Sequence, residues 1–329
     1  MKKIIYRLLP FFCSVTISVV FLLLCSKNTQ KALNTLLLAN ITNTYYFGNM
    51  LSYAALLMTA GCGAAFANKG GALNLGGEGQ IYMGGFTGCL VLNTMHGPYI
   101  LVFAAALLCA VISAALMSLL SAFFKQTKGA EVLLTTYLIS SAAIPVIDGF
   151  ITQSKANTNT NMLSLPYINE HYHLLRILEP SPLTIFFFVA VIICLFMWYL
   201  LYKTDTGQKT LIWGKAPQFA LFAGLSDTKN TYLTLTLSGL LHGLTGFIAV
   251  TGLYYTCHKG FYTGMGWNAL SVSLIADSNP LFVIPASLVL SYLITGCEQL
   301  SLTQSLGFDV STIIQSIILL SIAVKAVKK

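Results

Sequence analysis

The sequence predicts an all-α integral membrane protein with about ten transmembrane segments, and three observations support that prediction. Of the 329 residues, 56% are hydrophobic and 9% are charged, which leaves too little polar surface for a soluble globule of this length. The mean hydropathy is +0.76. Apolar runs of about 20 residues, the length of a helix that crosses a bilayer, recur along the chain between short polar stretches.

Ten segments have the composition expected of membrane helices. They are residues 4–25, 47–67, 80–94, 98–124, 130–150, 182–202, 231–255, 264–277, 280–299 and 308–326. Two of them, 80–94 and 264–277, are short and bordered by glycine, as in helices that are interrupted within a membrane. If these two do not cross, eight segments remain. No clean cleavage site follows the first segment, so we expect a retained anchor rather than a signal peptide.

The positions of the cations predict an orientation. Ten crossings from a cytoplasmic N-terminus leave only five of the 18 Lys and Arg residues outside. These five are Lys27, Lys31, Lys155, Arg176 and Lys259. Because cytoplasmic loops are enriched in Lys and Arg, both termini are expected in the cytoplasm. The formal charge of +8 is spread over segment ends rather than gathered on one face, which argues against a nucleic-acid partner. The partner surface is instead the lipid bilayer.

The eight cysteines lie singly in apolar runs, with no C-x-x-C pair and no interleaved histidine at ligand spacing. This pattern is typical of small packing residues and predicts neither a disulfide framework nor a metal site.

The stretch GGALNLGGEGQIYMGG, residues 70–85, is the most informative local feature. Non-helical backbone is tolerated at membrane depth only where protein or a water-filled cavity satisfies its polar groups, so this glycine-rich interruption indicates a transport path. Asn74, Glu78 and Gln80 are its candidate lining residues. Glu78 has two interpretations. It either accepts backbone N–H bonds at the start of the span that begins near Gln80, or it lines or gates the path.

Other embedded polar residues are weaker candidates. His242 lies in the small-residue run GLLHGLTG (239–246), which favours close helix packing with the imidazole bonded to a neighbour. Trp267 and Asn268 lie near the start of segment 264–277, the second short segment bordered by glycine. There an indole can stack on a solute ring while an amide binds the edge of that ring.

Two extramembrane segments are long enough to matter. Residues 151–181 form the predicted extracytoplasmic loop, which is too short to fold as a binding domain. We expect its two histidines, His171 and His173, at a solvated rim rather than at a metal. Residues 203–230 form the predicted cytoplasmic loop, in which a proline-started, glycine-ended helix presents an apolar face either to the membrane surface or to a partner protein.

These motifs resemble one known family. GALNLGGEGQIYMGG (71–85) is similar to the N-I-G-x-E-G-Q signature of permease subunits in bacterial ABC importers of the sugar and nucleoside type, the superfamily of the ribose and branched-chain amino-acid permeases. GKAPQFALFAGL (214–225) resembles that family's cytoplasmic loop, and LSGLLHGLTGFIAVTG (237–252) its small-residue-rich span. GFYTGMGWNALSVSLIADSNPLFVI (260–284) resembles its late glycine-bordered segment. The blocks follow the family's order and cover about residues 47–327.

The resemblance implies a single transmembrane permease domain, residues 1–329, in the bacterial cytoplasmic (inner) membrane. Its implied partners are an ABC ATPase, a second permease of the same or homologous sequence and an extracytoplasmic substrate-binding protein. The sequence has no G-x-x-x-x-G-K-[ST] phosphate loop, so ATP must be hydrolysed on another chain. We expect no cofactor on this chain, with ATP and Mg bound by the partner ATPase.

The resemblance also implies that the cytoplasmic loop holds a coupling helix seated in a groove of the ATPase. The matching positions, with two aromatic anchors, are Gly214, Pro217, Phe219, Ala220, Phe222, Ala223 and Gly224. Three positions depart from the family's loop motif: Ala216 replaces Asn, Phe219 replaces Ala and Leu221 replaces a basic residue. These departures bear on which ATPase fits.

The predicted function is therefore the channel-forming subunit of an ATP-driven importer that works by alternating access and catalyses no covalent chemistry. The form of the signature indicates nucleosides or related small polar solutes. The alternative is a secondary transporter driven by an ion gradient, with Glu78 or Asp148 as its ion site, and this alternative predicts transport by the chain alone. An intramembrane enzyme is disfavoured, because no Ser/His, paired Asp or H-E-x-x-H constellation occurs at one membrane level.

Overall fold

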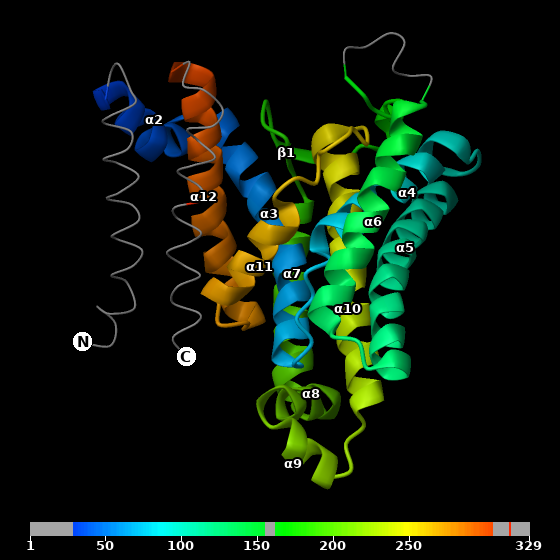
Figure 1. Ribbon diagram of the computed structural model, residues 1–329. Coiled ribbons are helices and arrows are strands. Elements are labelled where there is room, and N and C mark those ends of the chain that lie inside the picture. The colour runs from blue at the N-terminus through cyan, green and yellow to red at the C-terminus, as the bar shows by residue number, and fades with distance from the viewer. Residues whose placement is uncertain (1–28, 155–161, 305–315, 317–329) are drawn as a thin grey trace.

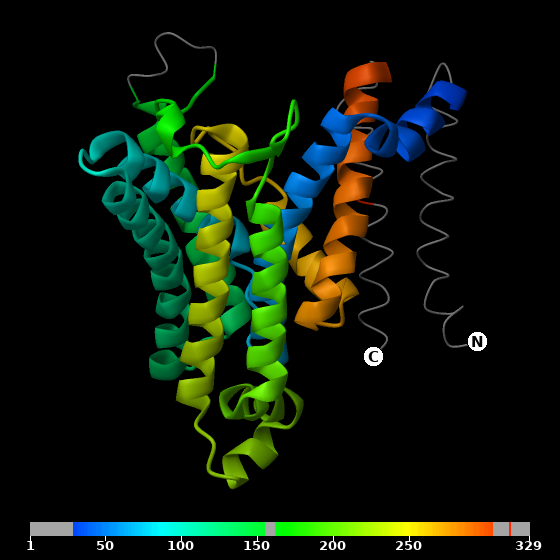
Figure 2. The ribbon, with the colours of Figure 1, turned by 180° about the vertical axis from the view of Figure 1, so that it is seen from behind.

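The computed structural model describes residues 29–154, 162–304 and 316. Figure 1 shows these residues as a bundle of helices that runs between two ends. One end carries α8 (Asp205–Lys215) and α9 (Pro217–Phe222) and is called the α9 end. The opposite end carries a two-stranded hairpin and is called the hairpin end. Figure 2 shows the same arrangement from behind, with α8 and α9 beyond the last turns of the long helices.

The other helices, in chain order, are α2 (Thr29–Thr42), α3 (Thr44–Lys69), α4 (Gly77–Thr94), α5 (Tyr99–Lys128), α6 (Val132–Thr152), α7 (Phe186–Lys203), α10 (Asp227–Ile248), α11 (Met265–Ile275) and α12 (Pro280–Gln304). Shorter elements are the 3-10 helix η2 (Glu170–Tyr172) and the π-helical turn η3 (Ala249–Tyr254), which extends α10. Strands β1 (Arg176–Leu178) and β2 (Leu183–Thr184) pair antiparallel.

Within the described residues, six helices are long and apolar enough to cross a membrane: Thr44–Lys69, Tyr99–Lys128, Val132–Thr152, Phe186–Lys203, Asp227–Tyr254 and Pro280–Leu300. Each coincides with a predicted segment. The other two predicted segments in this part of the chain, 80–94 and 264–277, are helices α4 and α11, and α11 has only 11 residues. The first and last predicted segments, 4–25 and 308–326, lie outside the described residues.

Six of the ten predicted segments are therefore candidate membrane spans in the described part of the chain, and α4, with 18 residues, and α11, with 11 residues, are not among them. Several elements were not predicted, among them helices α2 and α8 and the β1–β2 hairpin. Helix α2 was missed because its 14 residues mix leucines with polar side chains and carry no strong apolar period. The β1–β2 hairpin begins within residues 151–181, which were predicted as a loop.

Burial separates the central helices from the peripheral ones. We compare the buried share of an apolar 18-residue stretch in each helix. This share is 89% in α3 and 72% in α10 with η3, but only 33% in α5, 22% in α6 and 28% in α7. A helix that is apolar all round and buried lies at the centre of a bundle, while an apolar helix with exposed faces must contact lipid or another chain. Helices α3 and α10 are therefore the axis of the fold.

Close approach of α10 to α4 depends on glycine. A Cβ atom built on Gly246 would lie 1.9 Å from the carbonyl oxygen of Ile81, and one built on Gly84 would lie 2.4 Å from the carbonyl oxygen of Gly243. Only a residue without a side chain fits at these positions. The small-residue face predicted for this span, with His242 bonded to a neighbour, is confirmed.

Candidate functional site

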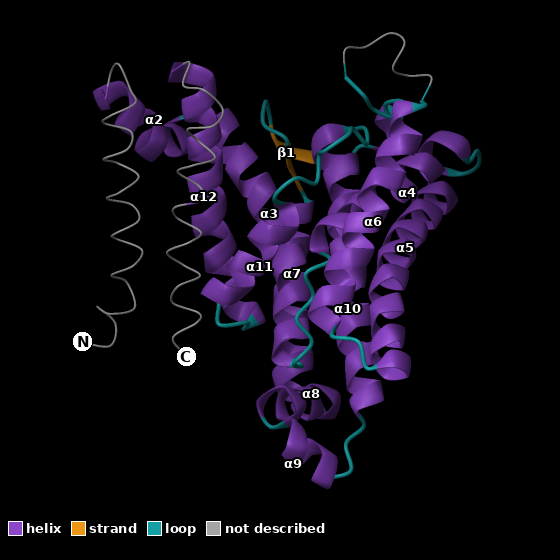
Figure 3. Cartoon of the chain, in the orientation of Figure 1, coloured by secondary structure: helices purple, strands orange, loops and turns teal. Residues whose placement is uncertain are grey.

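The predicted interruption separates α3 from α4. Helix α3 ends at Lys69, Gly71 turns the chain with a φ of 77°, and the residues up to Gly76 are non-helical. Figure 3 shows this segment as a loop that leaves the α9 end of α3 and runs back into the bundle to the start of α4. The chain therefore passes through the interior of the protein without a helix.

Side chains of α6 satisfy the backbone of this loop. The Leu75 N–H donates to the Thr136 hydroxyl at 3.1 Å, and the Gly79 N–H, in the first turn of α4, donates to the Ser140 hydroxyl at 2.7 Å. The Gly76 N–H donates to the side-chain carbonyl of Asn74 at 2.9 Å. Buried N–H groups outside regular structure need such partners, and α6 supplies two of them.

Asn74 and Gln80 belong to a buried network with α10. The Asn74 amide donates to Gln80 Oε1 at 3.0 Å and to the Ser238 hydroxyl at 2.9 Å. His242 Nδ1 lies 2.7 Å from Gln80 Oε1. Because that oxygen can only accept, Nδ1 carries the proton, and the other ring nitrogen of His242 has no hydrogen-bond partner among the described residues. Asn74 and Gln80 are therefore bonded to protein groups in the interior of the bundle.

Glu78 links the start of α4 to the start of α11, two helices that each follow a non-helical segment. Its carboxylate accepts the N–H of Gly264, the N-cap residue of α11, at 2.8 Å. The contact is close, since a Cβ atom built on Gly266 would lie 2.4 Å from the Glu78 nitrogen. The first interpretation of Glu78 placed this carboxylate against the N–H groups at the start of α4; the structure instead bonds it to the start of α11, so the interpretation was wrong about the helix.

The two candidates on α11 have different surroundings. Asn268 is buried, and its amide donates to the Tyr53 hydroxyl of α3 at 3.2 Å. Trp267 is 44% exposed. The structure therefore brings Asn74, Glu78, Gln80 and Asn268 into the region where α3, α4, α10 and α11 meet, and leaves the Trp267 indole at the surface of this chain.

Asp148, the other candidate ion site of the secondary-transporter alternative, already has partners. It accepts the Tyr82 hydroxyl at 2.6 Å, and Lys259 Nζ lies 3.8 Å from its second oxygen. A carboxylate that is paired with a cation and a hydroxyl is poorly placed to take up a further ion.

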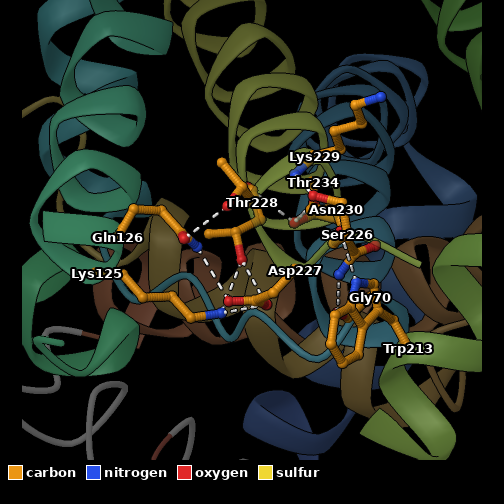
Figure 4. Close-up of polar contacts among 11 residues, drawn as sticks. Gly70, Lys125, Gln126, Trp213, Ser226, Asp227, Thr228, Lys229, Asn230 and Thr234 are labelled. Carbon is orange, nitrogen blue, oxygen red and sulfur yellow. Dashed lines mark hydrogen bonds and ion pairs between the residues drawn. The ribbon is translucent and has the colours of Figure 1, made fainter. Parts of the chain in front are cut away.

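The turn at the α9 end of α3 contacts both α8 and α10. The side-chain amide of Asn230 donates to the Gly70 carbonyl at 2.8 Å, as Figure 4 shows. A Cβ atom on Gly214, at the end of α8, would lie 1.9 Å from the carbonyl oxygen of Lys69. The indole N–H of Trp213 donates to the Ser226 carbonyl at 2.9 Å, which ties α8 to the start of α10.

A polar cluster fixes the start of α10 to the end of α5 (Figure 4). Lys125 Nζ lies 2.9 Å from the Asp227 carboxylate, whose other oxygen accepts the Gln126 amide at 3.0 Å. Lys125 also donates to the Thr231 hydroxyl at 2.7 Å. The Lys125 and Asp227 side chains are 30% and 39% exposed, so their ion pair alone contributes little to stability. The connection between α5 and α10 depends instead on the whole set of hydrogen bonds.

Helix α9 confirms the helix predicted between Pro217 and Gly224. Pro217 occupies the first turn, and Gly224 follows the helix with a φ of 75°. Ala220 is fully buried, whereas Phe219 is 63% exposed and Phe222 is 92% exposed. Two aromatic rings thus project from one end of the protein.

Sequence reasoning missed a cavity of about 340 Å³ at the hairpin end. Its lining residues come from α3, the hairpin and its loop, η3 and α12, and are Tyr45, Asn49, Tyr53, Arg176, Pro180, Pro182, Leu253, Tyr254, Tyr255, Thr295 and Glu298. Because these positions are far apart in sequence, no local motif marks the cavity.

The two histidines near the hairpin differ in exposure: His171 is exposed, as expected for a solvated rim, whereas His173 is half-buried. The His173 ring stacks on Tyr255 with centroids 3.9 Å apart, and the His171 ring meets the edge of Tyr99 at 4.7 Å. Burial lowers the pKa of His173 from its usual value, so this imidazole is neutral at pH 7. Among the described residues no group of His, Cys, Asp and Glu could hold a metal ion.

Comparisons with known proteins agree with these features. Residues 46–323 match the family described as branched-chain amino acid transport system / permease component. The chain is 31% identical to the probable riboflavin import permease protein of Treponema pallidum, over 98% of this chain and 86% of that protein. It is 24% identical to a guanosine ABC transporter permease protein of Bacillus subtilis, over 85% of this chain and 81% of that protein. A nucleoside ABC transporter permease protein of Lactococcus lactis is 25% identical, over 76% of this chain and 81% of that protein.

Proposed function

Because the chain belongs to the branched-chain amino acid transport system permease family, we propose that it is the channel-forming subunit of an ATP-driven importer that works by alternating access. An ABC permease implies a separate ATPase and a substrate-binding protein. A second permease, the same chain or a homologue, would complete the membrane part. The observation that carries the proposed division of roles is α9, whose Phe222 side chain is 92% exposed at one end of the bundle.

The α9 end is proposed to face the cytoplasm. Most of the described cations belong to that end. They are Lys69, Lys125, Lys128, Lys203, Lys209, Lys215 and Lys229. Fewer lie toward the hairpin end, namely Lys31, Arg176 and Lys259. This bias has the sign of the positive-inside rule. Residues 151–181 would then be extracytoplasmic and meet the substrate-binding protein, and residues 203–230 would form the cytoplasmic coupling loop.

Helix α9 is proposed as the coupling helix. Phe219 and Phe222 are free to enter a groove of the ATPase, while buried Ala220 holds the helix against the chain. Movement of α9 would reach the interruption through α8. Gly214 at the end of α8 is in direct contact with the carbonyl of Lys69, so a displacement of α8 would push on the start of the interruption. This path supports a role for the α3–α4 interruption in opening and closing the solute path.

The proposed solute is a nucleoside or a related compound in which a heteroaromatic ring carries a polyol. The names of the relatives support this class, since they include guanosine, nucleoside and riboflavin permeases. Neutral solutes of this kind need no strong site in a permease, because the binding protein can supply recognition and a strongly binding path would slow release.

Co-purification tests the proposal. The chain, tagged, would be expressed with a candidate ATPase and second permease, as wild type, as a Pro217→Ala, Phe219→Ala, Phe222→Ala triple variant, and as Tyr167→Ala, an exposed aromatic outside the coupling loop. We expect the ATPase to be retained by wild type and Tyr167→Ala and lost from the triple variant. Retention of the ATPase by the triple variant would refute the coupling role of α9.

A further inference from the structure

The cavity at the hairpin end has the size and lining of a small-molecule site. Its volume of about 340 Å³ is within the range of about 300–1,000 Å³ typical of ligand pockets. A second cavity, lined mainly by apolar residues of α3, α7 and η3, has only about 10 Å³, room for no more than a water. We propose that the larger cavity binds the heteroaromatic ring of a neutral solute, with tyrosines against its faces and Asn49, Arg176 and Glu298 at its edge.

This inference rests on the proposed function, since it names a solute site within the importer. Four tyrosines line the cavity: Tyr45, Tyr53, Tyr254 and Tyr255. Aromatic side chains stack on nucleic-acid bases and similar rings irrespective of the substitution pattern, because every such ring has a π-face. A simple sugar has no aromatic ring and would gain less from this lining. The cavity therefore favours solutes with a heteroaromatic ring over simple sugars.

Part of the aromatic wall is held in place before any solute arrives. Tyr255 has a φ of 58°, which is uncommon for a residue with a side chain. Its ring is stacked on His173, and its hydroxyl accepts from Arg176 Nε and Nη2 at 3.1 and 3.0 Å and donates to the Gly252 carbonyl at 3.1 Å. Contacts on several sides that hold a residue in an uncommon conformation indicate a pre-organised site.

The charges in the lining select against charged solutes. Arg176 and Glu298 both line the cavity, and no ion pair between them occurs in the described part of the chain. One cation and one anion leave the lining close to neutral. A nucleobase or flavin ring has N–H donors for a carboxylate and carbonyl acceptors for a guanidinium. A phosphate group, in contrast, would bring up to two negative charges to a lining whose one cation, Arg176, already donates to Tyr255 and whose other charge is the Glu298 carboxylate, so phosphorylated forms should be disfavoured.

The cavity is connected to the interrupted helices. Tyr53 lines the cavity and its hydroxyl accepts from Asn268 on α11. The N-terminus of α11 is in turn bonded by Glu78 on α4. A ring seated against Tyr53 therefore touches the group of helices that contains both interruptions, which is where a solute must act if its presence is to favour opening of the path.

Uptake by the complete transporter tests this inference. The chain with its partners would be reconstituted in liposomes, and ATP-driven uptake would be measured for guanosine, riboflavin, glucose and the monophosphate of guanosine. For the ring-bearing probe that wild type carries, we expect Tyr45→Leu and Glu298→Gln each to raise KM about tenfold. Tyr45→Phe keeps the ring, and Tyr199→Leu changes an exposed tyrosine of α7 outside the lining, so both should stay near wild type.

The outcomes separate the two claims. The amount of assembled complex, measured for every variant, identifies any that fails to fold. If wild type hydrolyses ATP and imports a ring-bearing probe while Tyr45→Leu and Glu298→Gln import it with unchanged KM, the cavity assignment is wrong and the importer proposal stands. Uptake of glucose or of the phosphorylated nucleoside in preference to the ring-bearing neutral probes also overturns the cavity assignment. A wild-type complex that does not couple ATP hydrolysis to uptake of any probe overturns the proposed function.

Discussion

The α3–α4 interruption and the cavity at the hairpin end use polar residues in opposite ways. At the interruption, Asn74 and Gln80 are buried, bonded to each other and surrounded by glycine contacts that exclude a single added carbon. In the cavity, Arg176 and Glu298 line an open volume, and no ion pair joins them among the described residues. The difference supports the proposal that the interruption transmits movement as a close-packed joint, whereas the cavity is open to a molecule.

Adding a side-chain carbon at this close-packed contact should have the largest effect on stability. Gly214→Ala places a carbon 1.9 Å from the Lys69 carbonyl oxygen, so α8 and the turn that begins the interruption must move apart, at a cost of about 3 kcal/mol in the free energy of unfolding. The matched control is Gly149→Ala in α6, where nothing lies within 4 Å of the new carbon. Thermal unfolding of the purified chain measures both, and equal melting temperatures for the two variants would contradict the close-packed joint.

Removing one hydrogen bond at the start of the interruption should have an intermediate effect on stability. Asn230→Ala removes the hydrogen bond to the Gly70 carbonyl and leaves that buried acceptor without its donor, which should lower the free energy of unfolding by about 1–3 kcal/mol. Because the turn then moves separately from α10, solute-stimulated ATP hydrolysis should fall more than basal hydrolysis. Lys229→Gln, at the exposed neighbouring position, serves as the control. Equal loss of both activities in Asn230→Ala would mean that this contact is only structural.

Changing the cavity should have the smallest effect on stability. The Tyr45 side chain is 46% exposed, so Tyr45→Leu should alter the free energy of unfolding by no more than about 0.5 kcal/mol. Thermal unfolding without solute measures this. A large loss of stability in this variant would show that the cavity wall supports the fold, and the contrast with the interruption would disappear.

Most of the fold follows from local sequence. Length and composition placed eight helical segments in the described part of the chain, and Pro217 and Gly224 marked the limits of α9 because their backbone preferences act within one turn. Glycine at 70–85 marked the interruption for the same reason. Helix α2 and the β1–β2 hairpin were not predicted, since neither has the apolar length or period that identifies a segment.

The site was predicted less completely, because its contacts join distant segments. The sequence placed Glu78 at a helix start, but the bonded helix is α11, and the Glu78 to Gly264 hydrogen bond has a sequence separation of 186. The cavity combines Tyr45 with Glu298, which no spacing rule relates. Local patterns identify the interruption, while the side chains that surround an open volume require the three-dimensional fold.

The most direct test of the importer mechanism is uptake of guanosine or riboflavin into liposomes that contain the chain alone or the chain with its ATPase and second permease, with the substrate-binding protein supplied outside the liposomes in both cases. The mechanism predicts uptake that requires ATP and the partners, is insensitive to an imposed ion gradient, and is lost in the Pro217→Ala, Phe219→Ala, Phe222→Ala variant. Uptake by the chain alone, driven by a proton or sodium gradient without ATP, would contradict it and make Glu78 the first residue to titrate.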